Sequence, residues 1–191
     1  MPDQKPKTIP RDISWLSFNG RVLQEAADET VPLWERIRFL GIFSNNLDEF
    51  FRVRVATLKR MIQVGSKAKM HLEEHPEKIL EEIQMTVLNQ QSEFNRIWEN
   101  ILEEMRDQKI FLVTEKDLNP EQQEFVQRYY DEEVSANIIP LMIESIQDLP
   151  FLRDKSIYLG VVLSKEESAL KRMYSIIEVP TRVQSRFVLL P

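Results

Sequence analysis

The sequence has no cysteine, only two histidines and only four glycines among its 191 residues. Without cysteine it can form neither disulfides nor thiolate metal sites, and a reducing compartment is favoured. With so few, widely separated glycines it contains neither the G-x-x-x-x-G-K-[ST] phosphate loop nor the G-x-G-x-x-G dinucleotide turn. The G-x-S-x-G elbow of the hydrolases is missing as well. The residues present therefore offer none of these active sites.

Long apolar runs are also missing. One of the longest, IYLGVVL at 157–163, is far shorter than the roughly 20 residues that a membrane helix needs. The N-terminal MPDQKPKTIPRD lacks the apolar core of a secretory signal. The net charge of −6 argues against a nucleic-acid partner. We expect a cytoplasmic protein with no transmembrane segment and no nucleic-acid partner.

The first half of the chain has helical periodicity. Residues 1–13 read as a loosely held lead-in, and a helix is predicted from Ser14 to about Ala27. Pro32 favours a restart, with one helix to about Phe43 and a third over 47–62. A long helix is predicted from Pro76 to about Asp107. The apolar stripe of the first helix would consist of Trp15, Phe18, Val22 and Ala26, widened by Leu16, Leu23 and Ala27.

After Lys109 the pattern changes to short apolar segments. Strands are predicted at 110–113, 156–163, 173–179 and 186–190, and Asn119-Pro120 predicts the start of a helix to about Asn137. Because the sheet begins late and the chain stops directly after an apolar segment, we expect a truncated second domain. The predicted fold class is α+β, with an N-terminal helical bundle (1–107) followed by a truncated mixed α/β domain with a small sheet (108–191).

One motif is typical of a metal site. His71-Leu72-Glu73-Glu74-His75 satisfies the H-x-x-E-H pattern of zinc proteases, which needs both imidazoles on one helical face. Pro76 follows directly and disfavours helical geometry at His75. We therefore interpret the segment as a solvated loop and predict no metal site in this chain.

The stretch SNNLDEFFRVRV at 44–55 allows two interpretations. If a helix begins at Leu47, Asn46 is its N-cap and Glu49 completes a capping box. That account leaves Asn45 unexplained, as well as six basic against three acidic residues over 35–60. A carboxamide also matches the edge of an adenine ring, and nearby cations suit phosphates. Capping and a nucleotide contact both remain open on the residues alone.

The long helix carries a strongly acidic face. Residues 72–107 contain ten acidic against three basic residues. Such a run is typical of a solvated helix face. The alternative function for the whole chain is a non-catalytic acidic helical scaffold that docks basic protein partners.

Two segments carry a family resemblance. ISWLSFNGRVLQEAAD (13–28) and PLWERIRFLGIFSNNLDEFFRVRVATLKR (32–60) closely resemble the N-terminal helical domain of the bacterial, histidine-phosphorylating polyphosphate kinases. Residues beyond 108 resemble the start of that family's head domain. The resemblance implies the N-terminal part of an enzyme that reversibly transfers the terminal phosphate of ATP to polyphosphate through a phosphohistidine.

The resemblance also implies particular sites and partners. The family's S-N-N-L-D-E-F asparagine, here Asn46, contributes to the adenine end of ATP. The catalytic histidines and the ligands of Mg²⁺ lie in later domains, so this chain alone is expected to be inactive. The partners implied are ATP or ADP, polyphosphate, and further copies of the enzyme joined through the head domain. The longer enzyme could associate peripherally with a membrane.

Overall fold

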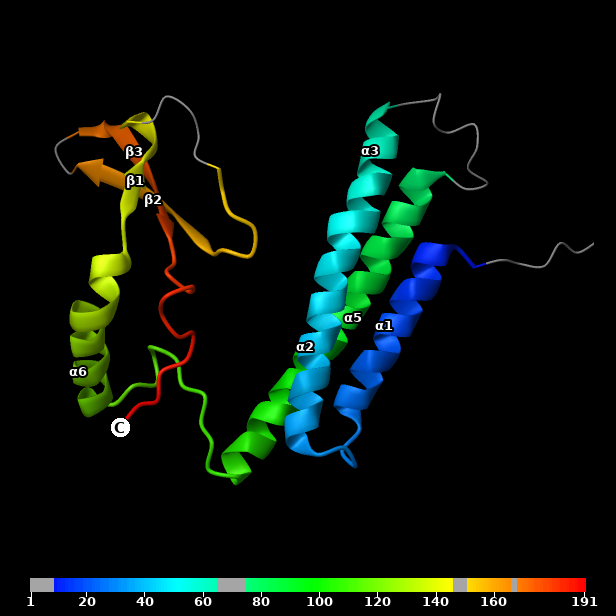
Figure 1. Cartoon of the computed structure of the whole chain (residues 1–191), viewed down its shortest axis with the longest axis horizontal. Coiled ribbons are helices and arrows are strands. Elements are labelled where there is room, and N and C mark those ends of the chain that lie inside the picture. The colour runs from blue at the N-terminus through cyan, green and yellow to red at the C-terminus, as the bar shows by residue number, and fades with distance from the viewer. Residues whose placement is uncertain (1–8, 65–74, 146–150, 166–167) are drawn as a thin grey trace, which may run out of the picture. The chain divides into compact units, whose positions relative to one another are not determined.

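The computed structural model describes residues 9–64, 75–145, 151–165 and 168–191 (Figure 1). The chain divides into two compact units, Met1–Leu112 and Val113–Pro191. The first is helical and the second combines a helix with a small antiparallel sheet, which confirms the predicted α+β class. The boundary we placed after residue 107 stays a prediction.

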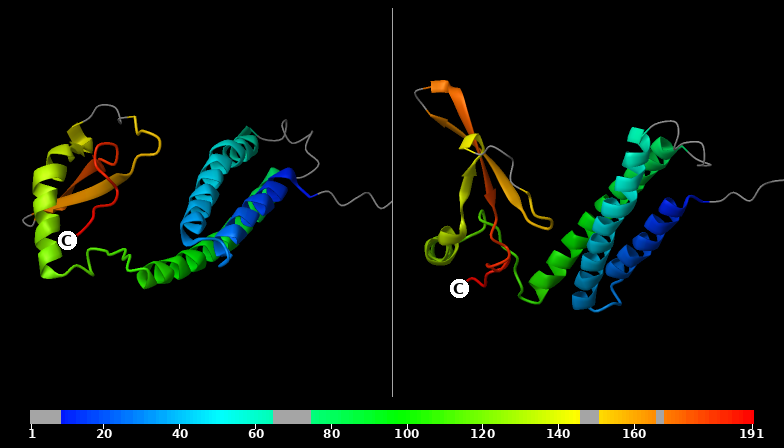
Figure 2. Two further views of the ribbon diagram at one scale, coloured as in Figure 1. Left: turned by 60° about the horizontal axis from the view of Figure 1, so that its bottom comes forward. Right: turned by 45° about the horizontal axis from the view of Figure 1, so that its top comes forward.

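The helical unit consists of three rods that lie side by side (Figures 1 and 2). The first is α1 (Arg11–Ala27). The second joins α2 (Leu33–Phe50), the π-helical turn η1 (Phe51–Val55) and α3 (Ala56–Val64) without a break. The third is α5 (Pro76–Asp107), which begins and ends where the sequence predicted. The second rod runs antiparallel to the other two.

The continuous second rod shows that two separate helices over 33–43 and 47–62 were the wrong prediction. No glycine or proline stands between Ile42 and Val64, so nothing forces the backbone out of the helical region. Phe50 and Phe51 both have helical dihedral angles where the α-helix passes into the π-helical turn. Asn46 therefore caps no helix, and Asp48 and Glu49 do not lie in a first turn.

The start of α1 lies earlier than predicted. Helix α1 begins at Arg11, so residues 11–13 are not part of a loose lead-in, and Asp12 is buried in the first turn. Two hydrogen bonds hold its carboxylate to Arg54, from Nε at 2.7 Å and from Nη2 at 3.2 Å. These bonds raise the pKa of the Arg54 guanidinium above its usual value. A first-turn acid also suits the helix dipole, so both effects fix this helix end.

The apolar core forms two clusters along the three rods. Leu47 is half-buried and packs against both of them. On α1 the buried positions after Asp12 are Leu16, Asn19, Leu23 and Ala26, while Phe18 is 51% exposed. The predicted stripe thus holds for Leu16, Leu23 and Ala26, but it wrongly included Phe18 and missed Asn19, because it assumed that only apolar side chains could face inward.

A buried arginine joins all three rods. Arg36 is 2% exposed, and its Nε donates to the carbonyl oxygen of Ala26 at 2.8 Å. Its Nη1 pairs with the carboxylate of Glu104 on α5. Ala26 lies in the last turn of α1, where carbonyl groups have no partner within the helix. Arg36 therefore satisfies a helix end and neutralises an acid of the third rod.

The second unit contains α6 (Pro120–Tyr129), a π-helical turn at Tyr130–Val134 and a 3₁₀ turn at Ser135–Asn137. Asn119 caps α6, as the Asn-Pro signal predicted, and it forms a reciprocal capping box with Gln122. Three strands make a sheet of order β1-β3-β2, all antiparallel. They are β1 (Pro140–Met142), β2 (Tyr158–Lys165) and β3 (Ser168–Glu178).

Two predicted strands are wrong and one observed strand was not predicted. Residues 110–113 and 186–190 pair with no strand in the described part of the chain. At 110–113 the reason is local, because Lys109 has a φ of 64° and Ile110 N–H donates to Met105 O at 2.9 Å. This Schellman closure uses Ile110 to end α5. Strand β1 has only three residues and gave no periodic signal.

Replacing Arg36 with methionine should lower the free energy of unfolding of the helical unit by about 2 to 3 kcal/mol, because Glu104 and the Ala26 carbonyl lose their partner. The three tryptophans, Trp15, Trp34 and Trp98, all lie in this unit, so urea unfolding followed by their fluorescence reports on it. Arg38→Met is the matched control. Arg38 is exposed, and among the described residues its ion-pair partner is Glu35, so its loss should cost less than about 0.5 kcal/mol. Equal losses in the two variants would contradict the role given to Arg36.

Replacing Asn119 with alanine should destabilise α6 by about 1 kcal/mol, because the Gln122 N–H loses its acceptor at 2.9 Å. Amide hydrogen exchange of Gln122 should become about fivefold faster. Glu124→Ala, an exposed change in the same helix, should leave that rate unchanged. An unaltered rate in Asn119→Ala would show that the cap is not populated.

Candidate functional site

Asn46 lies in the interior of α2, four residues before its end at Phe50, and its side chain is half-buried. The side chain faces α1, where its Nδ2 donates to Oδ1 of Asn19 at 3.1 Å. Its neighbour Asn45 is exposed. The capping interpretation of Asn46 is therefore wrong, and a different interaction holds this amide.

Asn19 is the partner that holds it. This residue is 0% exposed, in the middle of the apolar face of α1. Its Nδ2 donates to the carbonyl oxygen of Phe43 at 3.2 Å, and its Oδ1 receives the bond from Asn46. A buried amide needs such partners, since an unsatisfied polar group costs about 1 to 3 kcal/mol.

The backbone determines which way round the NH₂ group and the oxygen of each of the two amides lie. The Phe43 carbonyl can only accept, so the NH₂ group of Asn19 must face it. Oδ1 of Asn19 then points to Asn46, which must present its own NH₂ group in return. Oδ1 of Asn46 consequently faces away from Asn19. In the described part of the chain this oxygen accepts no hydrogen bond.

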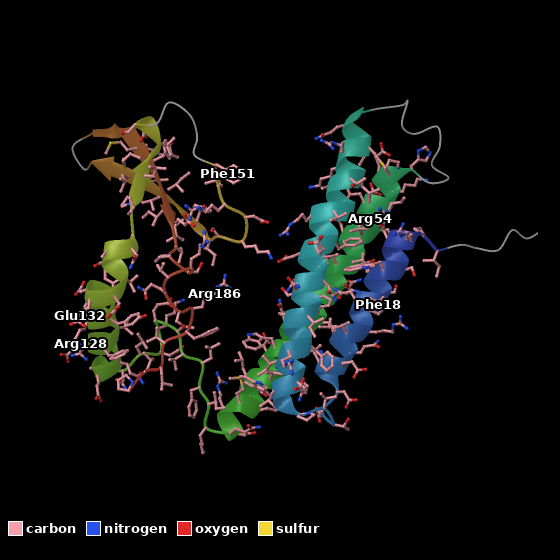
Figure 3. The ribbon with its side chains drawn as sticks, viewed as in Figure 1. Phe18, Arg54, Arg128, Glu132, Phe151 and Arg186 are labelled. Carbon is pink, nitrogen blue, oxygen red and sulfur yellow. The ribbon has the colours of Figure 1, made fainter. Side chains whose placement is uncertain are left out.

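The surface beside Asn46 is apolar. Ile42 and Val53 lie four residues before and seven residues after it, which places them on the same side of the rod, and both are exposed. On α1, Phe18 precedes Asn19 and is exposed as well (Figure 3). The stacked rings of Trp15 and Phe50, 4.7 Å apart, continue the same interface. A planar apolar ligand with one hydrogen-bond donor would suit this surface.

Most of the basic residues near this surface have acidic partners. Of the six over 35–60, Arg36 pairs with Glu104 and Arg54 with Asp12. Arg38 and Arg52 pair with acids three residues earlier on the same rod. Four of the six thus already have a carboxylate beside them, and Lys59 and Arg60 are exposed near the end of α3. The excess of basic residues over 35–60 is largely explained by structural ion pairs.

Within the described residues, no group of three or more histidine or acidic side chains could hold a metal ion. Four residues of the H-x-x-E-H segment, 71–74, lie outside the described residues, and His75 precedes the first turn of α5. No described helix is both long and apolar enough to cross a membrane.

The sequence singled out Asn46 but not Asn19. The available signal was an asparagine between Leu16 and Leu23, at the heptad position where the stripe needs an inward side chain. Asparagine at a buried helix position is rare enough to predict a polar partner on the facing helix. Finding that partner required the pairing of α1 with α2.

Two family models match the chain. Residues 8–113 match the polyphosphate kinase N-terminal domain, and residues 121–191 match the polyphosphate kinase middle domain. The resemblance seen in the sequence is confirmed by both. The acidic scaffold is not favoured by these matches.

Several curated relatives and one solved structure agree with the models. The chain is 43% identical over 184 residues to the polyphosphate kinase of Vibrio parahaemolyticus, covering 96% of this chain and 26% of that protein. It is 41% identical over 189 residues to the Escherichia coli K12 polyphosphate kinase, covering 98% and 27%. The crystal structure of polyphosphate kinase from Porphyromonas gingivalis matches with a TM-score of 0.74 and 36% identity, over 95% of this chain and 26% of that one. The chain thus spans about a quarter of the length of these relatives, and it belongs to the polyphosphate kinase family.

Proposed function

We propose that this chain is the N-terminal part of an ATP:polyphosphate phosphotransferase, which reversibly moves the terminal phosphate of ATP to polyphosphate through a phosphohistidine. Support comes from family membership over both units and from relatives named polyphosphate kinase. ATP or ADP and polyphosphate are then the small-molecule partners, and further copies of the enzyme are the protein partners. The proposed setting is cytoplasmic, with peripheral membrane association of the longer enzyme.

The share of this chain in the reaction is binding and positioning. The proposed role is to hold the nucleotide base, while the phosphoryl group is transferred in regions of the enzyme beyond these residues. Holding one end of ATP places its terminal phosphate relative to the attacking group, which lowers the entropic part of the barrier. A phosphohistidine divides the transfer into two in-line displacements. On this proposal the chain alone has no phosphotransferase activity.

The proposed cofactor Mg²⁺ would be bound outside this chain. Within the described residues no three acidic or histidine side chains come together, so these residues offer no all-protein cage for the ion. No step on these residues is assigned to the metal.

The observation that carries the base contact is the unpaired Oδ1 of Asn46, beside an exposed apolar surface. The exocyclic amine of adenine is a hydrogen-bond donor, which this oxygen would accept. The ring would lie against exposed apolar side chains such as Ile42 and Phe18. Together the two contacts use side chains from α1 and α2, and the Asn19–Asn46 bond joins those helices.

Replacing Asn46 with alanine in a full-length polyphosphate kinase that carries this chain should raise the KM for ATP about three- to tenfold, the worth of one neutral hydrogen bond. The KM for polyphosphate and the kcat should change less than twofold. Steady-state kinetics with each substrate varied in turn measure all three values.

Asn45→Ala is the matched control, since the neighbouring exposed asparagine does not face α1, and its ATP KM should equal that of the unmodified enzyme. Thermal unfolding should accompany the kinetics, because Asn46→Ala also leaves Oδ1 of Asn19 without a donor. A lower Tm combined with an unchanged ATP KM would leave Asn46 a structural residue and refute the base contact.

A further inference from the structure

Asn19 holds the amide of Asn46 in one of its two possible orientations. We propose that Asn19 is a positioning residue that makes the Asn46 surface selective for a 6-amino purine over a 6-oxo purine. This inference rests on the proposed function, because it requires that Asn46 contacts the base. Asn19 would contact no substrate itself, and its hold on Asn46 would account for the preference for adenine.

The selectivity depends on which end of the amide faces the ligand. An unrestrained asparagine amide can rotate by 180°, which exchanges a donor for an acceptor at nearly the same position. Here the flipped form would place two acceptor oxygens, Oδ1 of Asn46 and Oδ1 of Asn19, about 3 Å apart, and the fully buried Asn19 has no water to separate them. The orientation that directs Oδ1 of Asn46 outward is therefore strongly favoured.

Asn19 itself cannot flip to accommodate Asn46. Its Nδ2 is bound to the Phe43 carbonyl, and turning the amide would set Oδ1 against that carbonyl oxygen. Because the side chain is 0% exposed, no water is available to replace the lost bond. The Phe43 carbonyl thus fixes the orientation of the Asn19 amide, and the Asn19 amide in turn fixes that of Asn46 at the surface.

The purines differ at the atom that this oxygen would meet. Adenine carries an amino group at position 6, which donates, whereas guanine carries a carbonyl oxygen there, which accepts. An outward Oδ1 attracts the amine and repels the carbonyl. A site built to hydrogen-bond one group rejects an analogue that cannot pair, since the buried partner is left unsatisfied.

A purely structural role for Asn19 would be to set the register between α1 and α2. That role predicts a change in stability but none in base preference. Asn19→Leu separates the two roles, because leucine has a similar volume and removes both hydrogen bonds. Asn19→Asp keeps an acceptor toward Asn46, and its protonated form can also donate to the Phe43 carbonyl, so it should preserve the orientation.

The experiment measures kcat/KM for ATP and for GTP, with polyphosphate as acceptor, in a full-length polyphosphate kinase that carries this chain. Asn19→Leu should reduce the ATP-over-GTP ratio about tenfold, mainly through a higher KM for ATP, with circular dichroism confirming the fold. Asn19→Asp should retain the ratio within about twofold. If Asn19→Leu does not fold, Asn19→Ala tests the same loss of orientation with a smaller side chain.

Gln90→Met is the matched control. Gln90 on α5 makes the same kind of bond to α1, from Nε2 to the Leu16 carbonyl at 2.8 Å, away from Asn46. Its loss should leave the base preference unchanged. An unmodified ratio in folded Asn19→Leu, together with a raised ATP KM in Asn46→Ala, would overturn the positioning role alone. An unchanged ATP KM in Asn46→Ala would overturn the base contact itself.

Discussion

A fully enclosed amide must find its hydrogen bonds inside the protein, and this constraint at Asn19 governs how α1 meets α2. The side chain has no access to water, so its donor and its acceptor both bind groups on the facing helix. An apolar residue at this position would tolerate small shifts of one helix along the other. The amide does not, because both bonds would break together.

The same register is held at three levels by polar contacts spaced seven residues apart along α1. Asp12 binds Arg54, Asn19 binds Asn46, and the carbonyl of Ala26 binds Arg36. As the residue numbers rise along α1, those of the partners on the second rod fall, as they must between antiparallel helices. Leu16 and Leu23 fill the intervals between these contacts. Apolar packing supplies the stability of the interface, and the polar contacts fix its alignment.

The sequence predicted the elements with strong periodic or capping signals and missed those that depend on tertiary partners. The long helix from Pro76 and the cap at Asn119 follow from local chemistry, and both are present. Asn46 was placed at a helix start because Asn followed by acids is a capping pattern, but without a breaker the helix continues. The early start of α1 depends on Arg54, more than forty residues away, and the burial of Arg36 depends on Glu104. No window of local sequence contains those partners.

The central claim is that Oδ1 of Asn46 faces the base of the nucleotide, with its amide held by Asn19. A structure of the full-length polyphosphate kinase with a non-hydrolysable ATP analogue tests this most directly. The account predicts that the adenine amine lies within hydrogen-bond distance of Oδ1 of Asn46, and that Nδ2 still donates to Asn19. An adenine ring bound away from α1 and α2, or an Asn46 amide turned with its oxygen toward Asn19, would contradict it.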